Sequence, residues 1–536
     1  MKKYLAILLT VLMLFSSVSA LAEYEGYFKT NVGLVNLPLT DQEETLSYAG
    51  YDSWLSNYSY KDDQPIWKLF EEQTGVKIDF QVYSSGELES ALSVRLTSGM
   101  NLPDITQLPP SWTNTGVMKY VDEGVIIDLT DLIDQYAPNI KALMEEDPYL
   151  AAQMIAPDGR IYSVMDVMYP INEVVPISFI IRRDWLEKLN LEVPTTVDDF
   201  YNVLHAFATQ DPNGNGKADE IPLIVNEVDG AVGYFGTGFG LPYTAINDNV
   251  YAFDEEGNCT FLFATEEAKA TLEFVNKLYN DGLIYKELTN DVSVVESLIA
   301  QDLVGCYPGQ PVDWLSRANS LTSETNGDWI MIAPPVDENG HTAISKRFPT
   351  GMYYGISADC KNPELAIKWI DYIGFSAEAN FIKDFGIEGK TFVYDEDGEP
   401  QFTDYIMNNP DGYSPHDAMR TVGGAPSVLV FDTPENYLMK FAGSTVYDCI
   451  IALQPYMVDA NPLILPSQEE SAAYSEVWPD IQVYYKEMFA RFISGSESLD
   501  NFDGFVETMN DIGLDKVLEI KSNQMHRYKE YMNSIG

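Results

Sequence analysis

The chain has 536 residues, of which 46% are hydrophobic and 12% aromatic. One hydrophobic core rarely serves so long a chain, so at least two domains or lobes are expected. The composition excludes a disordered protein. The formal net charge of −50 at pH 7 argues against nucleic acid and anionic membrane surfaces as partners.

The first 22 residues have the three parts of an export signal. Lys2 and Lys3 precede an apolar stretch, and Ala20-Leu21-Ala22 fits a signal-peptidase site. Residues 1–22 are therefore expected to be a cleaved signal peptide, which leaves Glu23 as the first mature residue. The alternative is an uncleaved anchor, although the apolar stretch is shorter than the ~20 residues that a membrane span needs.

Along the chain, short strand-like runs alternate with helical ones, which predicts an α/β protein. The expected strands are residues 45–48, 76–82, 221–225 and 302–307. The expected helices are residues 64–72, 88–97, 197–207, 266–278, 363–373, 477–492 and 502–532, with Thr196 as the N-cap of the third. Such alternation predicts lobes built on open sheets, whose ligands bind at strand ends and between lobes.

The cysteines and histidines form no recognisable transition-metal motif. No Cys-x-x-Cys pair and no closely spaced histidines occur, so a zinc site is not expected. Export would permit disulfides, and one pair or none is expected. The cysteines concerned are Cys259, Cys306, Cys360 and Cys449.

The sharpest local motif is the sequence DPNGNGKADE at residues 211–220. It matches the first part of an EF-hand loop, in which oxygen ligands alternate and a glycine at position 6 permits the bend. Position 12, where EF-hands place a bidentate glutamate, is Pro222, and Glu220 is the natural substitute. The predicted calcium ligands are Asp211, Asn213, Asn215, Lys217 through its carbonyl, Asp219 and Glu220.

The alternative for this loop is an ordinary Asn-Gly surface turn. The added Asp219-Glu220 pair favours calcium, because hard Ca²⁺ takes six to eight oxygen ligands. We predict a structural role for the metal, which would fix the loop between a helix and a strand.

Five segments in this order carry a family resemblance: residues 98–105 (SGMNLPDI), 158–162 (DGRIY), 181–196 (IRRDWLEKLNLEVPTT), 278–284 (LYNDGLI) and 385–389 (FGIEG). Together they resemble the family 1 extracellular solute-binding proteins of carbohydrate ABC importers. The resemblance is strongest to the long subgroup of alginate-binding proteins and related lipoproteins. The alginate-binding members look to have the same calcium loop, whose Asp-Glu ending falls here on Asp219 and Glu220.

This resemblance implies a two-lobed, type II periplasmic-binding-protein-like fold with a hinge and an interlobe ligand cleft. One lobe would contain residues 23–165 and 345–395, and the other residues 166–344 and 396–536. The implied function is to capture an oligosaccharide outside the membrane and deliver it to permease subunits. A monomer without catalytic activity is expected. Many relatives carry a lipidated cysteine after the signal, but here Glu23 stands there, which favours a periplasmic or freely secreted form.

A sugar site needs aromatic faces and carboxylates, and candidates follow the expected strands. They are Asp52, Trp54, Trp112, Tyr234, Phe235, Trp314 and Tyr353. The alternative for each aromatic is ordinary packing. Trp112 and Trp314 are the first choices, because neither belongs to an amphipathic helix. Residues 183–185 (RDW) are expected to serve the fold at the start of a helix.

Two other function classes remain as alternatives. A secreted glycoside-processing enzyme could draw its two carboxylates from 82 acidic residues. However, no G-x-S-x-G, H-E-x-x-H or Walker motif occurs. A calcium-dependent adhesion module would show repeats and β-rich patterning, and neither is present. The acidic surface favours a neutral or mildly modified oligosaccharide over a uronic-acid polymer.

Overall fold

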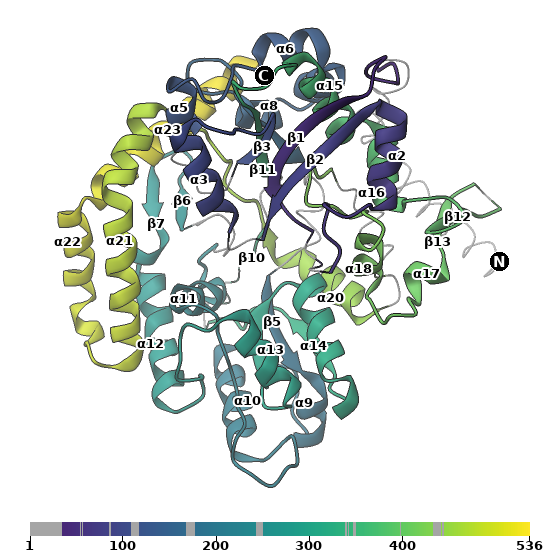
Figure 1. Cartoon of the computed structure of the whole chain (residues 1–536). Coiled ribbons are helices and arrows are strands. Elements are labelled where there is room, and N and C mark those ends of the chain that lie inside the picture. Colours follow the sequence, from purple (N-terminus) through teal and green to yellow (C-terminus); the bar gives the residue numbers. More distant parts are fainter. Residues whose placement is uncertain are drawn as a thin grey trace, which may run out of the picture.

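The computed structural model describes residues 35–535, apart from residues 54, 56, 85–86, 109–116, 168–176, 243–249, 338–339, 341, 343, 347–349, 397, 432–440 and 442–443. Within these residues the chain forms two large sheets, three small two-stranded ones and many helices. Figure 1 shows the larger sheet at the upper right and the second sheet below it.

The first sheet has the strand order β2-β1-β3-β11-β4. β1 runs parallel to β2 and β3, whereas β11 is antiparallel to β3 and β4. Its strands are β1 (Glu44–Tyr51), β2 (Val76–Tyr83), β3 (Ile105–Leu108), β4 (Val164–Val167) and β11 (Thr350–Ile356). The predicted strands at residues 45–48 and 76–82 are thus confirmed, and both are longer than predicted.

Helices pack on this sheet or beside it and complete the first lobe, and the last two of them form a small core of their own. They are α2 (Pro65–Thr74), α3 (Leu88–Ser98), α5 (Val117–Asp122), α6 (Thr130–Tyr136), α7 (Pro138–Glu146), α8 (Pro148–Met154), α15 (Pro363–Phe375), α16 (Ala377–Phe385), α17 (Asp404–Met407) and α18 (Pro415–Arg420). A hairpin of β12 (Phe392–Tyr394) and β13 (Pro400–Phe402) projects from this side of the molecule (Figure 1).

The second sheet has the order β8-β5-β9 and is antiparallel throughout. Its strands are β5 (Ser178–Arg182), β8 (Cys306–Gly309) and β9 (Trp329–Ile332). The surrounding helices are α9 (Arg183–Leu189), α10 (Val197–Thr209), α11 (Val228–Gly236), α12 (Glu266–Asn280), α13 (Val292–Ala300), α14 (Ser316–Leu321) and α20 (Thr445–Leu453). Two small sheets pair β6 (Tyr251–Phe253) with β7 (Cys259–Phe261) and β10 (Ile344–Ser345) with β14 (Met457–Val458).

Two local predictions in this part fared differently. Thr196 caps α10 as predicted, in a capping box with Asp199. The predicted strand at residues 221–225 is wrong, because this buried segment makes only isolated bridges, from Ile221 to Val304 and from Leu223 to Ile284.

The C-terminal helices are α21 (Gln468–Ser494), α22 (Phe502–Ile512) and α23 (Leu514–Ile535), which confirms the predicted helical tail. They form the yellow arc at the left of Figure 1. The break between α22 and α23 falls at Gly513, whose φ is 126°. A Cβ there would also lie 2.8 Å from Cγ1 of Val477, so only glycine fits this turn.

The buried side chains form separate cores that define the two lobes. One core joins residues of the first sheet and its helices, and includes Val428, Leu429, Phe431 and, farther along the chain, Leu465. Two further cores join the second sheet, its helices and α21 to α23. The predicted division had assigned residues 422–431 to the second lobe. We instead propose a first lobe of residues 35–167 and 350–431, and a second lobe of residues 177–332, 441–453 and 468–520.

Candidate metal loop and ligand-contact residues

The loop of residues 211–220 connects α10 to the bridge that begins at Ile221. Its backbone enters the left-handed region at Asp211 (φ 48°), Gly214 (φ 75°) and Gly216 (φ 76°). Glycine reaches this region at little cost, and Asp is one of the few other residues that tolerate it. The sequence is therefore suited to a tight turn of this shape.

The side-chain oxygens at alternate positions turn into the loop. Asp211 Oδ2 accepts a hydrogen bond from the amide of Gly216 (3.0 Å). Asn213 Oδ1 accepts one from the amide of Asn215 (3.0 Å), and Asn215 Oδ1 one from the amide of Lys217 (2.8 Å). Positions 1, 3 and 5 of the EF-hand pattern thus face inward, as a calcium loop requires.

Two carboxylate oxygens of this loop are buried without a hydrogen-bond partner: Asp211 Oδ1 and Glu220 Oε1. Burial raises the pKa of Glu220, and the negative charges of Asp211 and Asp219 raise it further. Buried carboxylate oxygens without partners are costly, and a bound cation removes that cost. The two oxygens belong to residues that the sequence motif assigns as first and last ligands.

Across the described residues, no three His, Cys, Asp or Glu side chains form a group that could hold a metal ion by themselves. A metal at residues 211–220 would therefore also need the amide oxygens of Asn213 and Asn215 and the carbonyl of Lys217. This donor set consists of oxygens alone, which fits Ca²⁺ better than a transition metal.

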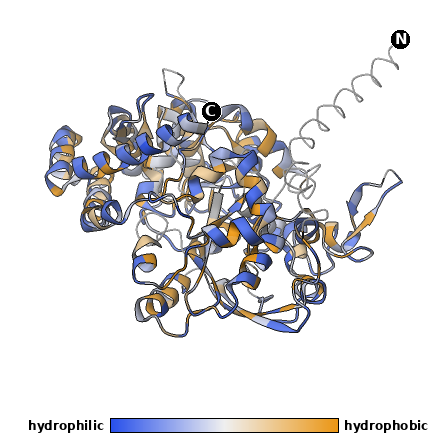
Figure 2. Ribbon diagram, turned by 90° about the horizontal axis from the view of Figure 1, so that it is seen from above, coloured by the Kyte–Doolittle hydropathy of each residue, from blue (hydrophilic) through white to orange (hydrophobic). Residues whose placement is uncertain are grey.

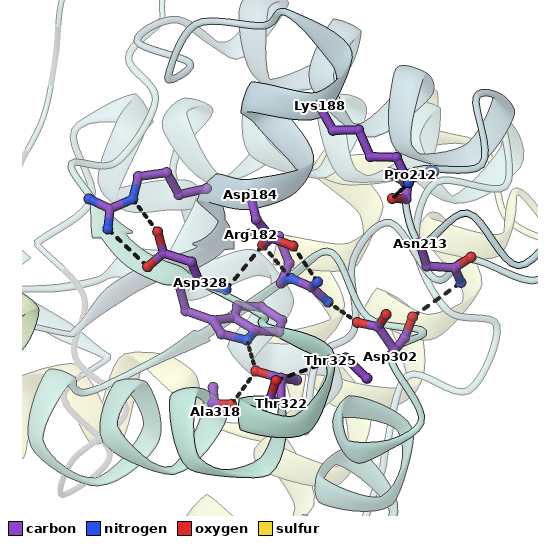
Figure 3. Close-up of polar contacts among 12 residues, drawn as sticks. Arg182, Asp184, Lys188, Pro212, Asn213, Asp302, Ala318, Thr322, Thr325 and Asp328 are labelled. Carbon is purple, nitrogen blue, oxygen red and sulfur yellow. Dashed lines mark hydrogen bonds and ion pairs between the residues drawn. The ribbon is translucent and has the colours of Figure 1, made fainter.

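Two contacts fasten the loop to the second lobe (Figure 3). Lys188 of α9 donates from Nζ to the carbonyl of Pro212 (2.5 Å). Asn213 donates from Nδ2 to the carbonyl of Asp302 (3.2 Å). The carboxylate of Asp302 in turn pairs with Arg182. The loop is thus linked through Asp302 to a charge buried beside the second sheet.

Arg182, the last residue of β5, is 1% exposed. Its Nε and Nη2 donate to the two carboxylate oxygens of Asp184 (2.7 and 2.6 Å), and its Nη1 pairs with Asp302. Its guanidinium carbon lies 4.6 Å from the ring centroid of Trp185 and 5.3 Å from that of Trp329. Two carboxylates and two tryptophan rings therefore replace water around this guanidinium.

Among the sugar-contact candidates, Asp52 follows β1 and shapes the next turn. Its Oδ1 accepts hydrogen bonds from the amides of Ser53 (2.8 Å) and Tyr60 (3.0 Å), and its Oδ2 accepts one from the hydroxyl of Ser59 (2.6 Å). The side chain stays half-exposed. Asp52 therefore shapes this turn, and its partial exposure leaves it a candidate for sugar contact. Trp54 and Trp112 lie outside the described residues.

The neighbouring candidates Tyr234 and Phe235 of α11 differ in surroundings. Tyr234 is half-buried, and burial raises the pKa of its phenol. Phe235 is 2% exposed and packs against Phe179 and Phe200 in the second core. The burial of Phe235 leaves no ring face for a sugar, and only Tyr234 of this pair stays a candidate.

Trp314 and Tyr353 also differ in burial. Trp314 is half-buried and packs edge-on against Tyr307, with ring centroids 5.4 Å apart. The guanidinium of Arg317 lies 5.6 Å from its centroid. Tyr353 is 1% exposed in β11, and its hydroxyl donates to the carbonyl of Gln153 (3.4 Å). Tyr353 thus belongs to the first core, which does not support the sugar contact predicted for it.

The fold also brings together a pair that sequence reasoning missed. Tyr58 and Tyr413 are both half-buried, and their rings meet edge to face with centroids 6.0 Å apart. Tyr58 lies in the turn that Asp52 shapes, at the carboxyl end of β1. Nothing in the sequence links these two tyrosines, because they come from distant segments that meet only in the folded lobe.

Comparison with known proteins decides the family. The bacterial extracellular solute-binding protein family model matches residues 55–379. The chain belongs to this family. Its relative FusA from Streptococcus pneumoniae serotype 4, a fructooligosaccharide ABC transporter substrate-binding protein, is 28% identical over 525 residues, which cover 93% of each chain.

Two solved structures extend the comparison of this solute-binding protein. The alginate-binding protein AlgQ2 without calcium ion gives a TM-score of 0.75 at 24% identity, covering 91% of this chain and 99% of that one. The S. pneumoniae FusA EF-hand mutant in complex with fructo-nystose gives 0.72 at 26% identity, covering 91% and 100%. The predicted family and the two-lobed α/β fold are therefore confirmed.

Family membership bears on two further predictions. Members of this family are binding proteins, which agrees with the expected lack of catalytic chemistry. Their extracellular setting agrees with export, although the predicted signal peptide at residues 1–22 lies outside the described residues. In the part of the chain that the structure describes, no helix has the length and apolarity to cross a membrane. The helices in Figure 2 accordingly mix hydrophilic and hydrophobic residues.

Proposed function

We propose that this solute-binding protein captures an oligosaccharide outside the membrane and delivers it to the permease subunits of a carbohydrate ABC importer. The observation that carries the proposal is the alignment over 93% of both chains with a fructooligosaccharide-binding relative. Two lobes with separate cores are the parts that closure on a ligand needs. The protein acts outside the cytoplasm as a monomer, without catalysis.

The contacts to the sugar come from half-buried aromatic rings and from Asp52. Aromatic faces stack on the C–H faces of sugar rings, and carboxylate oxygens accept hydrogen bonds from sugar hydroxyls. The described candidates are Asp52, Tyr58, Tyr234, Trp314 and Tyr413. Trp54 and Trp112 stay candidates on the sequence alone.

The loop at residues 211–220 binds a structural calcium ion. Its ligands are the side chains of Asp211, Asn213, Asn215, Asp219 and Glu220 and the carbonyl of Lys217. The ion would supply positive charge to the buried oxygens that accept no hydrogen bond, Asp211 Oδ1 and Glu220 Oε1. The AlgQ2 structure without calcium ion and the FusA EF-hand mutant support a calcium site of this kind in relatives.

Calorimetric titration with kestose, fructo-nystose, neutral glycans and alginate oligosaccharides tests the function. A neutral oligosaccharide should bind and be recovered intact by mass spectrometry. Trp314→Ala should weaken binding by about tenfold or more, equivalent to ~1.4 kcal/mol. The exposed Tyr394→Ala of β12 is the matched control and should bind as the wild type does. Failure of every glycan to bind would refute the proposal, and shortened products would favour a glycoside-processing enzyme.

Chelation tests the calcium loop. Removing the ion should lower the free energy of unfolding by ~2.7 kcal/mol when the starting concentration is about 100 Kd. Glu220→Gln should lose most of this response, whereas Glu255→Gln, at an exposed turn between β6 and β7, should keep it. Elemental analysis without calcium, together with an unchanged melting temperature after chelation, would contradict the proposal.

A further inference from the structure

Asp166 is a buried carboxylate in β4, 4% exposed. Its Oδ1 accepts hydrogen bonds from the hydroxyl of Tyr354 (2.7 Å) and the amide of Val430 (2.7 Å). Its Oδ2 accepts one from the amide of Met352 (3.1 Å). Three donors from two other segments of the chain therefore converge on one side chain.

These contacts lie where the chain passes between the lobes. One connection leaves the first lobe after Val167, the residue next to Asp166, and reaches the second lobe at Ser178. A second returns from the second lobe into β11, where Met352 lies. A third leaves after Phe431, one residue beyond Val430, and reaches the second lobe at residue 441. Asp166 thus lies at the first-lobe end of the first connection, and its carboxylate accepts hydrogen bonds from the first-lobe ends of the other two.

Further contacts in the same place hold the third connection. The amide of Val167 donates to the carbonyl of Val430 (2.9 Å), and Val167 forms a parallel bridge with Phe431. Leu429 has a φ of 48°, which a leucine adopts only when its surroundings impose it. Its amide donates to the hydroxyl of Tyr354 (2.9 Å), and its carbonyl accepts from the ammonium of Lys383, which is 2% exposed.

We propose that Asp166 is a positioning residue of the hinge: its carboxylate fixes the first-lobe ends of three interlobe connections and so controls how the lobes close on their ligand. The side chain at position 166 must accept three hydrogen bonds, from the amides of Val430 and Met352 and from the hydroxyl of Tyr354. This inference rests on the proposed function, because it assigns the hinge of the same binding protein.

Another buried aspartate provides a matched control. Asp371 of α15 is 0% exposed and likewise accepts hydrogen bonds, from Nδ2 of Asn139 (2.7 Å) and from the amide of Ile140 (2.8 Å). All of its partners lie in α7 of the first lobe. Asp371→Asn therefore replaces a similar buried carboxyl group without touching an interlobe connection.

Hydrogen exchange and small-angle X-ray scattering of Asp166→Asn and Asp371→Asn test the proposal. Asp166→Asn should speed amide exchange in residues 350–356 and 425–431 and change the radius of gyration of the ligand-free protein. Asp371→Asn should speed exchange around α7 and leave the radius of gyration unchanged. With fructo-nystose as the probe, Asp166→Asn should weaken binding about tenfold, ~1.4 kcal/mol, and Asp371→Asn less than about twofold.

Two milder substitutions test the same proposal if Asp166→Asn does not fold. Tyr354→Phe removes one hydroxyl from Asp166, and Tyr353→Phe removes the neighbouring buried hydroxyl of the same strand, which bonds to Gln153 instead. Only Tyr354→Phe should speed exchange in residues 425–431. If each hinge variant behaves like its control, the proposal is overturned. If the wild type binds no glycan, the proposed function fails, and the exchange and scattering data still decide the role of Asp166.

Discussion

Replacing the buried Arg182 by methionine should destabilise the second lobe, whereas the same replacement of its neighbour Arg183 should not. Arg182 is 1% exposed between two rings and pairs with Asp184 and Asp302. Arg183 pairs with Asp328, and both of those side chains keep about 40% of their surface exposed (42% and 39%). The two adjacent arginines therefore differ in burial and in the number of ionic partners.

The expected costs follow from that difference. Removing one partner of a buried ion pair costs about 3–5 kcal/mol, because a desolvated charge is left behind. Asp184 and Asp302 keep 28% and 20% of their side-chain surface exposed, so water can partly replace Arg182. We therefore expect the lower end of the range, ~3 kcal/mol, for Arg182→Met. An exposed pair contributes ~0–1 kcal/mol, which sets the expectation for Arg183→Met.

Urea unfolding followed by tryptophan fluorescence measures both costs, because Trp185 and Trp329 lie against the Arg182 guanidinium. The measurements are made with calcium present, so that the proposed calcium loop at residues 211–220 stays in one state. The unfolding transition of the second lobe should move to lower urea in Arg182→Met only. Equal midpoints for the two variants would refute the reasoning that burial sets the cost.

Two other predictions concern stability. Burial raises the pKa of the Asp371 carboxyl to about 7. The protonated carboxyl therefore contributes ~4 kcal/mol to the free energy of unfolding below pH ~4, and this contribution is lost as the pH rises through about 7. Asp371→Asn should lack this slope when melting is followed against pH, and parallel curves for variant and wild type would contradict it. Gly238→Ala should unfold at lower denaturant than Gly282→Ala, because its added Cβ would lie 2.0 Å from the carbonyl oxygen of Pro335. The Cβ of Gly282→Ala meets no neighbour, so that variant carries only the ~1–2 kcal/mol cost of its left-handed backbone (φ 74°). Equal losses in the two alanine variants would show that this contact relaxes at little cost.

Much of the fold followed from local patterns. The capping residue Thr196, the strands at residues 45–48 and 76–82 and the helical tail all carry their signals within a few neighbouring residues. The strand predicted at residues 221–225 failed because apolar residues were read as strand, and burial alone does not supply a ladder of partners. The buried Phe235 and Tyr353 lack support as sugar contacts for a related reason, since aromatic residues near strand ends can equally fill a core.

The sequence by itself determined the features whose atoms are close along the chain. The ligand spacing of residues 211–220 and the ordered family segments are of this kind. The family segments predicted a solute-binding protein, which is confirmed, and the ligand spacing predicts a calcium loop, which stays a prediction. Tertiary structure alone decided where charge is buried. Arg182 meets Asp302, and Asp166 meets Val430, only after distant segments pack together. A carboxylate or guanidinium acquires such a role from its desolvation and its partners, and neither exists before the chain folds.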